Sequence, residues 1–108
     1  MINEILKAVR KIKVGGNSTK ALLEYYLVEN GEDKYGIKVS KKTDGVLKVS
    51  EQRTLEYISD EEREADKVIK LLARNTVTPL TVENVLHDLG YVVWYIYFPF
   101  NWDVKNLF

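Results

Sequence analysis

Apolar side chains near the N-terminus recur at the spacing of a helix. The apolar positions between residues 2 and 13 are Ile2, Ile5, Leu6, Val9 and Ile12. A stripe of apolar residues three and four positions apart is typical of an amphipathic helix. The sequence therefore predicts a peripheral helix over residues 2–13, followed by a Gly-rich linker that extends to residue 19.

Three segments after this linker predict an antiparallel meander. Residues 21–29 are apolar on both faces, which suits a central strand, although a helix remains an alternative for them. Residues 34–41 alternate apolar and polar side chains, as a strand with one wet face does. An Asp-Gly pair favours a hairpin turn before residues 46–58, which resume an extended pattern with a bulge or break near Glu51.

A first helix is predicted over residues 60–74. The run Ser59-Asp60-Glu61-Glu62 is a capping box, and its acids suit the positive end of a helix dipole. Asn75 is expected to end the helix in a left-handed conformation. The side chains expected to face inward are Ala65, Val68, Ile69 and Leu72.

A second helix is predicted over residues 79–89. Thr78 is the expected cap, Pro79 suits the first helical position, and Gly90 ends the helix. The side chains expected to face inward are Leu80, Val82, Val85, Leu86 and Leu89.

The C-terminal segment is strongly aromatic. Residues 91–100 carry no charge, and their aromatic and β-branched side chains favour a strand. Because such residues are also enriched at protein interfaces, the segment is predicted to be either a further core strand or a partner-binding surface. The candidate partner-binding residues are Trp94, Tyr95, Tyr97, Phe98, Phe100 and Trp102.

These elements predict one α+β domain over residues 1–108. Its centre is a three- or four-stranded antiparallel sheet with two C-terminal helices packed on one face, and the amphipathic N-terminal helix is peripheral. The N-terminal helix and linker occupy residues 1–19, the α+β core residues 20–90, and the aromatic segment residues 91–108.

Composition excludes several kinds of site and indicates the compartment. The chain has no cysteine, which excludes disulfides, zinc-thiolate sites and thiol nucleophiles. It also shows neither the basic start of a signal peptide nor the ~20 apolar residues of a transmembrane helix, so we expect a cytoplasmic protein.

Charge is unevenly spread along the chain. Residues 1–20 carry five basic side chains against one acid, and residues 51–66 carry seven acids against two arginines. The two segments could attract each other within the molecule or between copies. The basic N-terminal helix could dock on the domain or a partner, or meet an anionic membrane or nucleic acid. Lysines that could add phosphate contacts are Lys34, Lys38, Lys41, Lys42 and Lys48.

No catalytic arrangement emerges from the sequence. His87 is the only histidine, and no cysteine is available to pair with it. In residues 15–20 the lysine follows the hydroxyl residues, which is the wrong order for a phosphate loop. Helix capping accounts for the acids of residues 60–66, and the second helix lacks the basic side chains of a DNA-recognition helix. We therefore predict no catalytic, cofactor or metal site.

Short motifs in the central block support a resemblance. They are residues 25–29 (Tyr-Tyr-Leu-Val-Glu), residues 35–37 (Tyr-Gly-Ile), the acid-capped helix and residues 75–80. Over about residues 20–90 the chain resembles a family of small clostridial-type bacterial proteins of unknown function. The resemblance implies a cytoplasmic α+β domain without an assigned activity, and the segment after Gly90 departs from it.

The functional hypothesis that follows is a non-enzymatic protein-interaction or regulatory module that self-associates as a homodimer. The alternative is a small nucleic-acid-binding protein that uses the basic N-terminal helix and the Lys-rich hairpin. The sequence names neither the partner nor the pathway.

Overall fold

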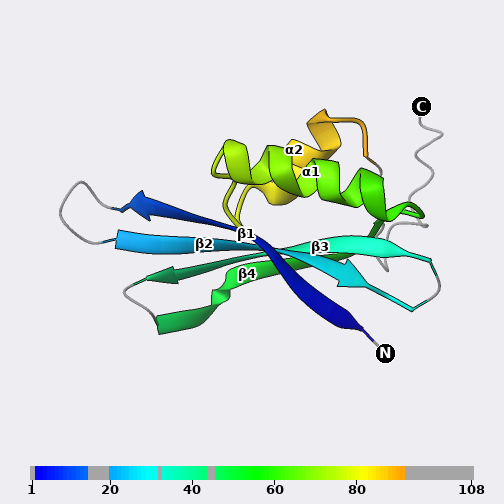
Figure 1. The fold of residues 1–108 in the computed structure, drawn as a ribbon. Coiled ribbons are helices and arrows are strands. Elements are labelled where there is room, and N and C mark those ends of the chain that lie inside the picture. The colour runs from blue at the N-terminus through cyan, green and yellow to red at the C-terminus, as the bar shows by residue number, and fades with distance from the viewer. Residues whose placement is uncertain (1, 15–19, 32, 44–45, 92–108) are drawn as a thin grey trace, which may run out of the picture.

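Four strands are followed by two helices (Figure 1). The computed structural model describes residues 2–14, 20–31, 33–43 and 46–91, without the side chains of residues 46–50. The strands are β1 (Asn3–Lys13), β2 (Lys20–Glu29), β3 (Tyr35–Thr43) and β4 (Val46–Ser59), and the helices are α1 (Glu62–Arg74) and α2 (Val82–Asp88).

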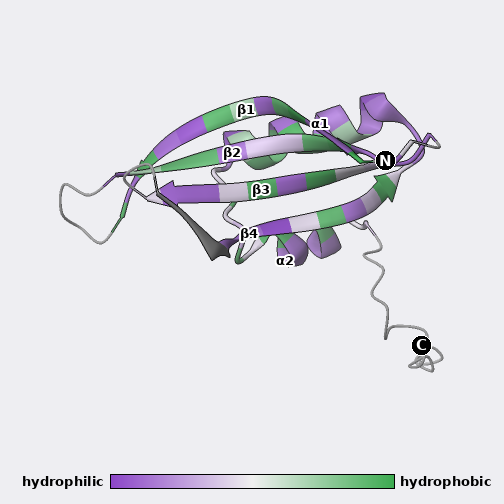
Figure 2. Ribbon diagram, turned by 90° about the horizontal axis from the view of Figure 1, so that it is seen from below, coloured by the Kyte–Doolittle hydropathy of each residue, from purple (hydrophilic) through white to green (hydrophobic). Residues whose placement is uncertain are grey.

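The strands form a single antiparallel sheet in the order β1-β2-β3-β4. Both helices lie on one face of this sheet (Figure 1), and the opposite face, seen in Figure 2, carries no helix of the described chain. The α+β class and the β2-β3-β4 meander are therefore confirmed. β2 lies inside the sheet, between β1 and β3, which fits its apolar character on both faces.

The predicted N-terminal helix is wrong, because this segment is the edge strand β1. Its pairing with β2 shifts register between Leu6 and Ala8, which marks a β-bulge. The extra residue moves the alternation of side chains by one position. Ile5, Ala8 and Ile12 consequently share the face that carries the helices, although their spacing in sequence is that of a helix.

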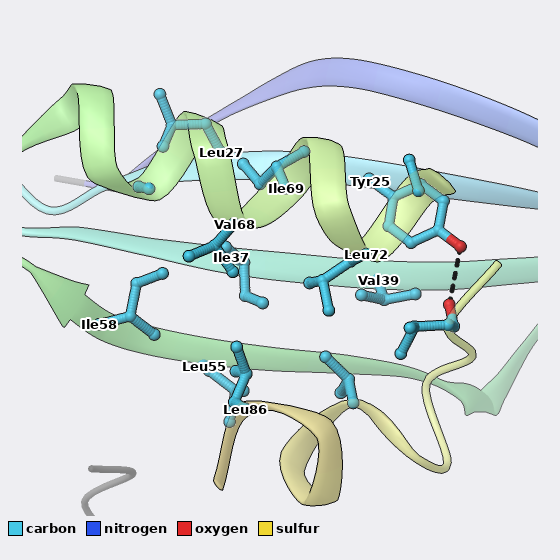
Figure 3. Packing of buried hydrophobic residues seen from close by; sticks show 14 of the residues in the cluster. Tyr25, Leu27, Ile37, Val39, Leu55, Ile58, Val68, Ile69, Leu72 and Leu86 are labelled. Atoms are coloured by element: carbon cyan, nitrogen blue, oxygen red, sulfur yellow. Dashed lines mark hydrogen bonds between the residues drawn. The ribbon is translucent and has the colours of Figure 1, made fainter. Parts of the chain in front are cut away.

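The core lies between the sheet and the two helices, and Figure 3 shows side chains from both of them. The four side chains predicted to face inward from α1 are all buried, which confirms that stripe. Full burial of one such aliphatic side chain stabilises a fold by about 1.5–3 kcal/mol. The sheet residues opposite them are Leu23, Tyr25, Leu27, Ile37, Val39 and Leu55.

A buried tyrosine joins the sheet to the loop after α1. The Tyr25 hydroxyl, on β2, donates a 2.7 Å hydrogen bond to the carbonyl oxygen of Val77 (dashed in Figure 3). Burial raises the pKa of Tyr25 to about 12. The hydroxyl therefore remains a neutral donor throughout the physiological pH range.

Both helices begin later than predicted. The Ser59 hydroxyl accepts a 2.9 Å hydrogen bond from the Glu61 amide, so it caps the turn before α1 instead of the helix. A separate turn precedes α2 and is closed by the Thr81 amide, which donates to the Thr78 carbonyl at 3.2 Å. This turn leaves Leu80 90% exposed, so its predicted inward position is wrong.

A left-handed residue ends each helix. After α1 it is Thr76 (φ 48°) and not the predicted Asn75, whose side-chain amide donates to the Leu71 carbonyl at 2.9 Å. The Thr76 amide donates to the Ala73 carbonyl at 3.0 Å, as in a Schellman motif. After α2 it is Gly90 (φ 94°), which confirms the predicted stop.

β4 is irregular at two places. The predicted break near Glu51 is confirmed, because the β3–β4 register shifts between Ser40 and Lys42. A second shift lies opposite Gly36. A Cβ atom at this position would lie 2.1 Å from the carbonyl oxygen of Leu55, so β4 approaches closely enough to require glycine.

Candidate interaction surface

β1 is an edge strand with exposed apolar side chains. Among the described strands it pairs with β2 alone, so the backbone groups on its outer side have no strand partner there. Ile5, Leu6 and Val9 are 37%, 49% and 44% exposed. An edge of this kind is a template for the addition of another strand.

The face without helices, which we call the open face, can be assigned from the strand register because directly opposite residues share a face. β1 contributes Glu4, Leu6, Val9 and Lys11, which lie opposite Val28, Tyr26, Glu24 and Leu22 of β2. The next strand, β3, adds Lys38, Ser40 and Lys42. Apolar and charged side chains thus adjoin each other directly beside the β1 edge.

A satisfied polar cluster lies at the centre of the open face. Glu24 is only 8% exposed, and its carboxylate accepts hydrogen bonds from the Tyr26 hydroxyl at 2.8 Å and the Ser40 hydroxyl at 3.4 Å. The Lys42 ammonium lies 3.2 Å from the same carboxylate. Burial alone would raise the pKa of Glu24, but these hydrogen bonds and the lysine charge hold it below its usual value. The cluster therefore fixes a paired carboxylate in the sheet.

Two charged side chains join β1 to β3 across β2. The Lys38 ammonium lies 3.0 Å from the Glu4 carboxylate and 5.1 Å from the centre of the Tyr26 ring. Burial and the bond to Glu24 raise the pKa of this tyrosine to about 12, so its ring stays uncharged beneath the lysine. These contacts hold the first half of β1 in place on the open face.

β1 is also held on the helix side of the sheet. Lys7 lies 3.5 Å from Asp66 of α1, and the Arg10 guanidinium donates to the Ala73 carbonyl at 3.0 Å, at the negative end of the same helix. The attraction expected between the basic N-terminal segment and the acidic segment thus occurs within the molecule. β1 consequently presents its outer side as a fixed edge.

Lysines gather on the open face at the hairpin end of the sheet. Lys13 and Lys20 lie directly opposite each other, and Lys11 and Lys42 flank Leu22 in the next row. Like charges directly across a strand pair are destabilising. Of these four lysines, only Lys42 has an acidic partner within the described residues.

The hairpin lysines predicted to bind nucleic acid do not share one surface. Lys38 and Lys42 lie on the open face and are paired with acids, whereas Lys41 lies opposite Leu23 on the helix side. Lys34 comes directly before β3, and its ammonium lies 5.9 Å from the centre of the Tyr57 ring. The side chain of Lys48 is outside the described residues, as are the aromatic candidates Trp94, Tyr95, Tyr97, Phe98, Phe100 and Trp102.

The remaining described candidates form no catalytic or metal-binding arrangement. His87 is exposed on α2, and within the described chain no group of histidine, aspartate and glutamate side chains is arranged to hold a metal ion. A groove of about 440 Å³ lies beside α1, and its lining includes Tyr91, whose hydroxyl donates to Glu64. Neither described helix has the length and apolar character needed to span a bilayer.

The edge of β1 is the surface that the sequence did not reveal. The helical interpretation placed Leu6 and Val9 on a docking stripe, whereas the bulge places both on the open face at the sheet edge. The available signal was the β-branched content of the segment, since isoleucine and valine favour strands.

Comparison with known proteins gives a family but no activity. No curated protein and no solved structure matches the chain. A family model described as a family of unknown function, DUF6514, matches residues 5–90. The match extends the resemblance predicted for residues 20–90 to include nearly all of β1, and it does not bear on clostridial origin. The chain therefore belongs to the DUF6514 family, whose function is unknown.

Proposed function

We propose that this protein is a non-enzymatic interaction module that binds a protein partner through β1 and the adjoining open face. The observation that carries the proposal is the combination of an outer β1 edge without a described strand partner and the exposed side chains of Ile5, Leu6 and Val9. Strand addition to such an edge gains affinity from main-chain hydrogen bonds and specificity from alternate side chains.

The fixed geometry of β1 favours binding. Contacts of Glu4 with Lys38, of Lys7 with Asp66 and of Arg10 with α1 restrain the strand from both faces. A restrained strand loses little conformational freedom when a partner pairs with it, so less of the interaction energy is spent on ordering. Leu6 and Val9 are about half exposed, and burying the remainder would add about 1 kcal/mol for each side chain.

The polar cluster around Glu24 serves the structure of the sheet and not catalysis. The Glu24 carboxylate already binds the Ser40 hydroxyl and the Lys42 ammonium within the sheet. These are the groups that would otherwise perform chemistry. The lowered pKa of Glu24 makes this carboxylate a poor general base, since a base works best with a pKa near the operating pH.

The test is site-specific photocrosslinking in the producing cell. The photoreactive amino acid p-benzoylphenylalanine replaces either Leu6 or Leu80. Leu6 lies on the β1 edge, and Leu80 is 90% exposed in the turn before α2. We expect a discrete protein adduct from position 6 that position 80 does not give. Equal adducts from both positions, or none from position 6, would contradict the proposal.

Nucleic-acid binding is a second candidate, favoured by one observation. Lys11, Lys13 and Lys20 gather at one end of the open face, where Lys13 and Lys20 face each other across the strand pair. A phosphate group bound there would relieve their repulsion. This surface differs from the predicted one, because its lysines lie on two neighbouring strands, β1 and β2, instead of on a basic helix.

The second candidate is tested by replacing Lys13 and Lys20 together with glutamine. If both lysines contact phosphates of a single-stranded oligonucleotide, the slope of log K against log salt becomes shallower by about 1.4. The matched control replaces Lys67 and Lys70, which lie on α1, and should leave the slope unchanged. A mobility-shift titration at low salt that detects no complex with the unmodified protein would remove this candidate.

A further inference from the structure

We infer that the partner of β1 is β1 of a second copy, paired antiparallel about a two-fold axis that passes between Lys7 and Ala8. The inference rests on the proposed function and names its partner. It follows from the register of β1 with β2, the position of the bulge and the order of side chains along the strand.

The bulge determines which residues can meet. Before it, Glu4 and Leu6 lie on the open face, and after it Val9 and Lys11 do. A two-fold axis perpendicular to the sheet keeps each side chain on its own face, so paired positions must share a face. In a strand without a bulge, Leu6 and Val9 would lie on opposite faces and could not pair.

The open-face residues brought together by this axis are complementary. Leu6 lies opposite Val9 of the second copy, and Glu4 lies opposite Lys11 of the second copy. The axis repeats each pair, which gives two apolar and two oppositely charged pairs on one continuous open face. Lys11 has no acidic partner among the described residues, and Glu4 is paired with Lys38 from the inner side of the sheet, across β2.

The irregular β4 edge limits assembly to two copies. The other edge of the sheet is β4, whose register with β3 is interrupted twice, so it offers no long regular edge for further pairing. Joining β1 to β1 would use the edge of each copy whose register is interrupted only once. The product is a closed pair of four-stranded sheets in place of a growing fibre.

Charge reversal of the predicted pair tests the register. The full chain is examined by sedimentation equilibrium as the unmodified protein and as Glu4→Lys, Lys11→Glu and the double variant. Each single variant places like charges opposite each other twice, and we expect the dimer Kd to rise about tenfold (about 1.4 kcal/mol). The double variant exchanges the charges and should restore the original Kd.

Several outcomes separate this inference from its alternatives. Far-ultraviolet circular dichroism verifies that each variant is folded, and Leu80→Lys serves as the control with an unchanged Kd. A monomer at every concentration, or a double variant weaker than both single ones, would overturn the inference. If the crosslink from position 6 then identifies a different protein, the proposed function stands without self-pairing, whereas no crosslink removes both.

Discussion

Replacing Tyr25 with phenylalanine removes one hydroxyl group from the centre of the fold. That hydroxyl donates to the Val77 carbonyl oxygen at 2.7 Å, and both residues are buried. Phenylalanine keeps the ring in place but leaves the carbonyl without its donor. An unsatisfied buried acceptor costs about 1–3 kcal/mol, so we expect the free energy of unfolding to fall by about 2 kcal/mol.

Urea denaturation followed by circular dichroism measures this loss. With a slope of about 1–3 kcal/mol per molar, as small proteins show, the midpoint should fall by about 1 M at an unchanged slope. The matched control is Tyr57→Phe, which removes a hydroxyl bonded to Asp60 at the surface and should leave the midpoint where it was. Equal midpoints for Tyr25→Phe and the unmodified protein would refute the role given to this bond.

The stability lost in Tyr25→Phe should also depend on pH. Folding raises the pKa of Tyr25 from about 10 to about 12, so the neutral hydroxyl is favoured in the folded state. Its contribution is complete below pH 10 and is lost as pH rises through 12, by about 2–3 kcal/mol in total. The stability difference between the unmodified protein and Tyr25→Phe should therefore shrink over this window. A difference that stays constant from pH 9 to 12 would show that Tyr25 does not titrate as the fold requires.

Three further changes test other parts of the fold. Gly36→Ala places a Cβ atom 2.1 Å from the Leu55 carbonyl oxygen and should lower the thermal midpoint by at least 10 °C or abolish soluble expression. Thr76→Gly relieves a β-branched residue at φ 48° and should raise the free energy of unfolding by up to about 1 kcal/mol in urea titrations. Glu24→Gln should destabilise the protein at pH 7, and the difference should vanish as pH falls below the lowered pKa of Glu24, because the unmodified carboxylate then also becomes neutral.

Local signals predicted the parts of the fold that depend on local contacts. The inward stripe of α1 follows from residues three and four apart, and Gly90 ends α2 because glycine accepts a positive φ at low cost. The Asp-Gly pair and the alternation around it predicted the β3–β4 hairpin. In each case the residues that decide the structure lie within a few positions of one another.

Contacts between distant residues decided what the sequence could not predict. The start of α2 depends on a turn closed between Thr78 and Thr81, which left Leu80 outside the core. The hydrogen bond from Tyr25 to Val77 joins residues 52 positions apart, and no pattern in either segment predicts it. The surface proposed for binding also depends on contacts between distant residues, since the neighbours of β1 are known only once β2 has paired with it.

One extra residue in β1 explains both the failed prediction and the proposed surface. A regular strand would alternate strictly, and the apolar residues of β1 would then have been recognised by their period of two. The bulge changes the parity after Leu6, which produces helix-like spacing in the sequence and, in the sheet, puts Leu6 and Val9 on one face. Bulges usually turn an edge away from pairing. Here the bulge lies where the proposed two-fold axis passes, so the copy that pairs with β1 carries the same irregularity at the same place and the two can match.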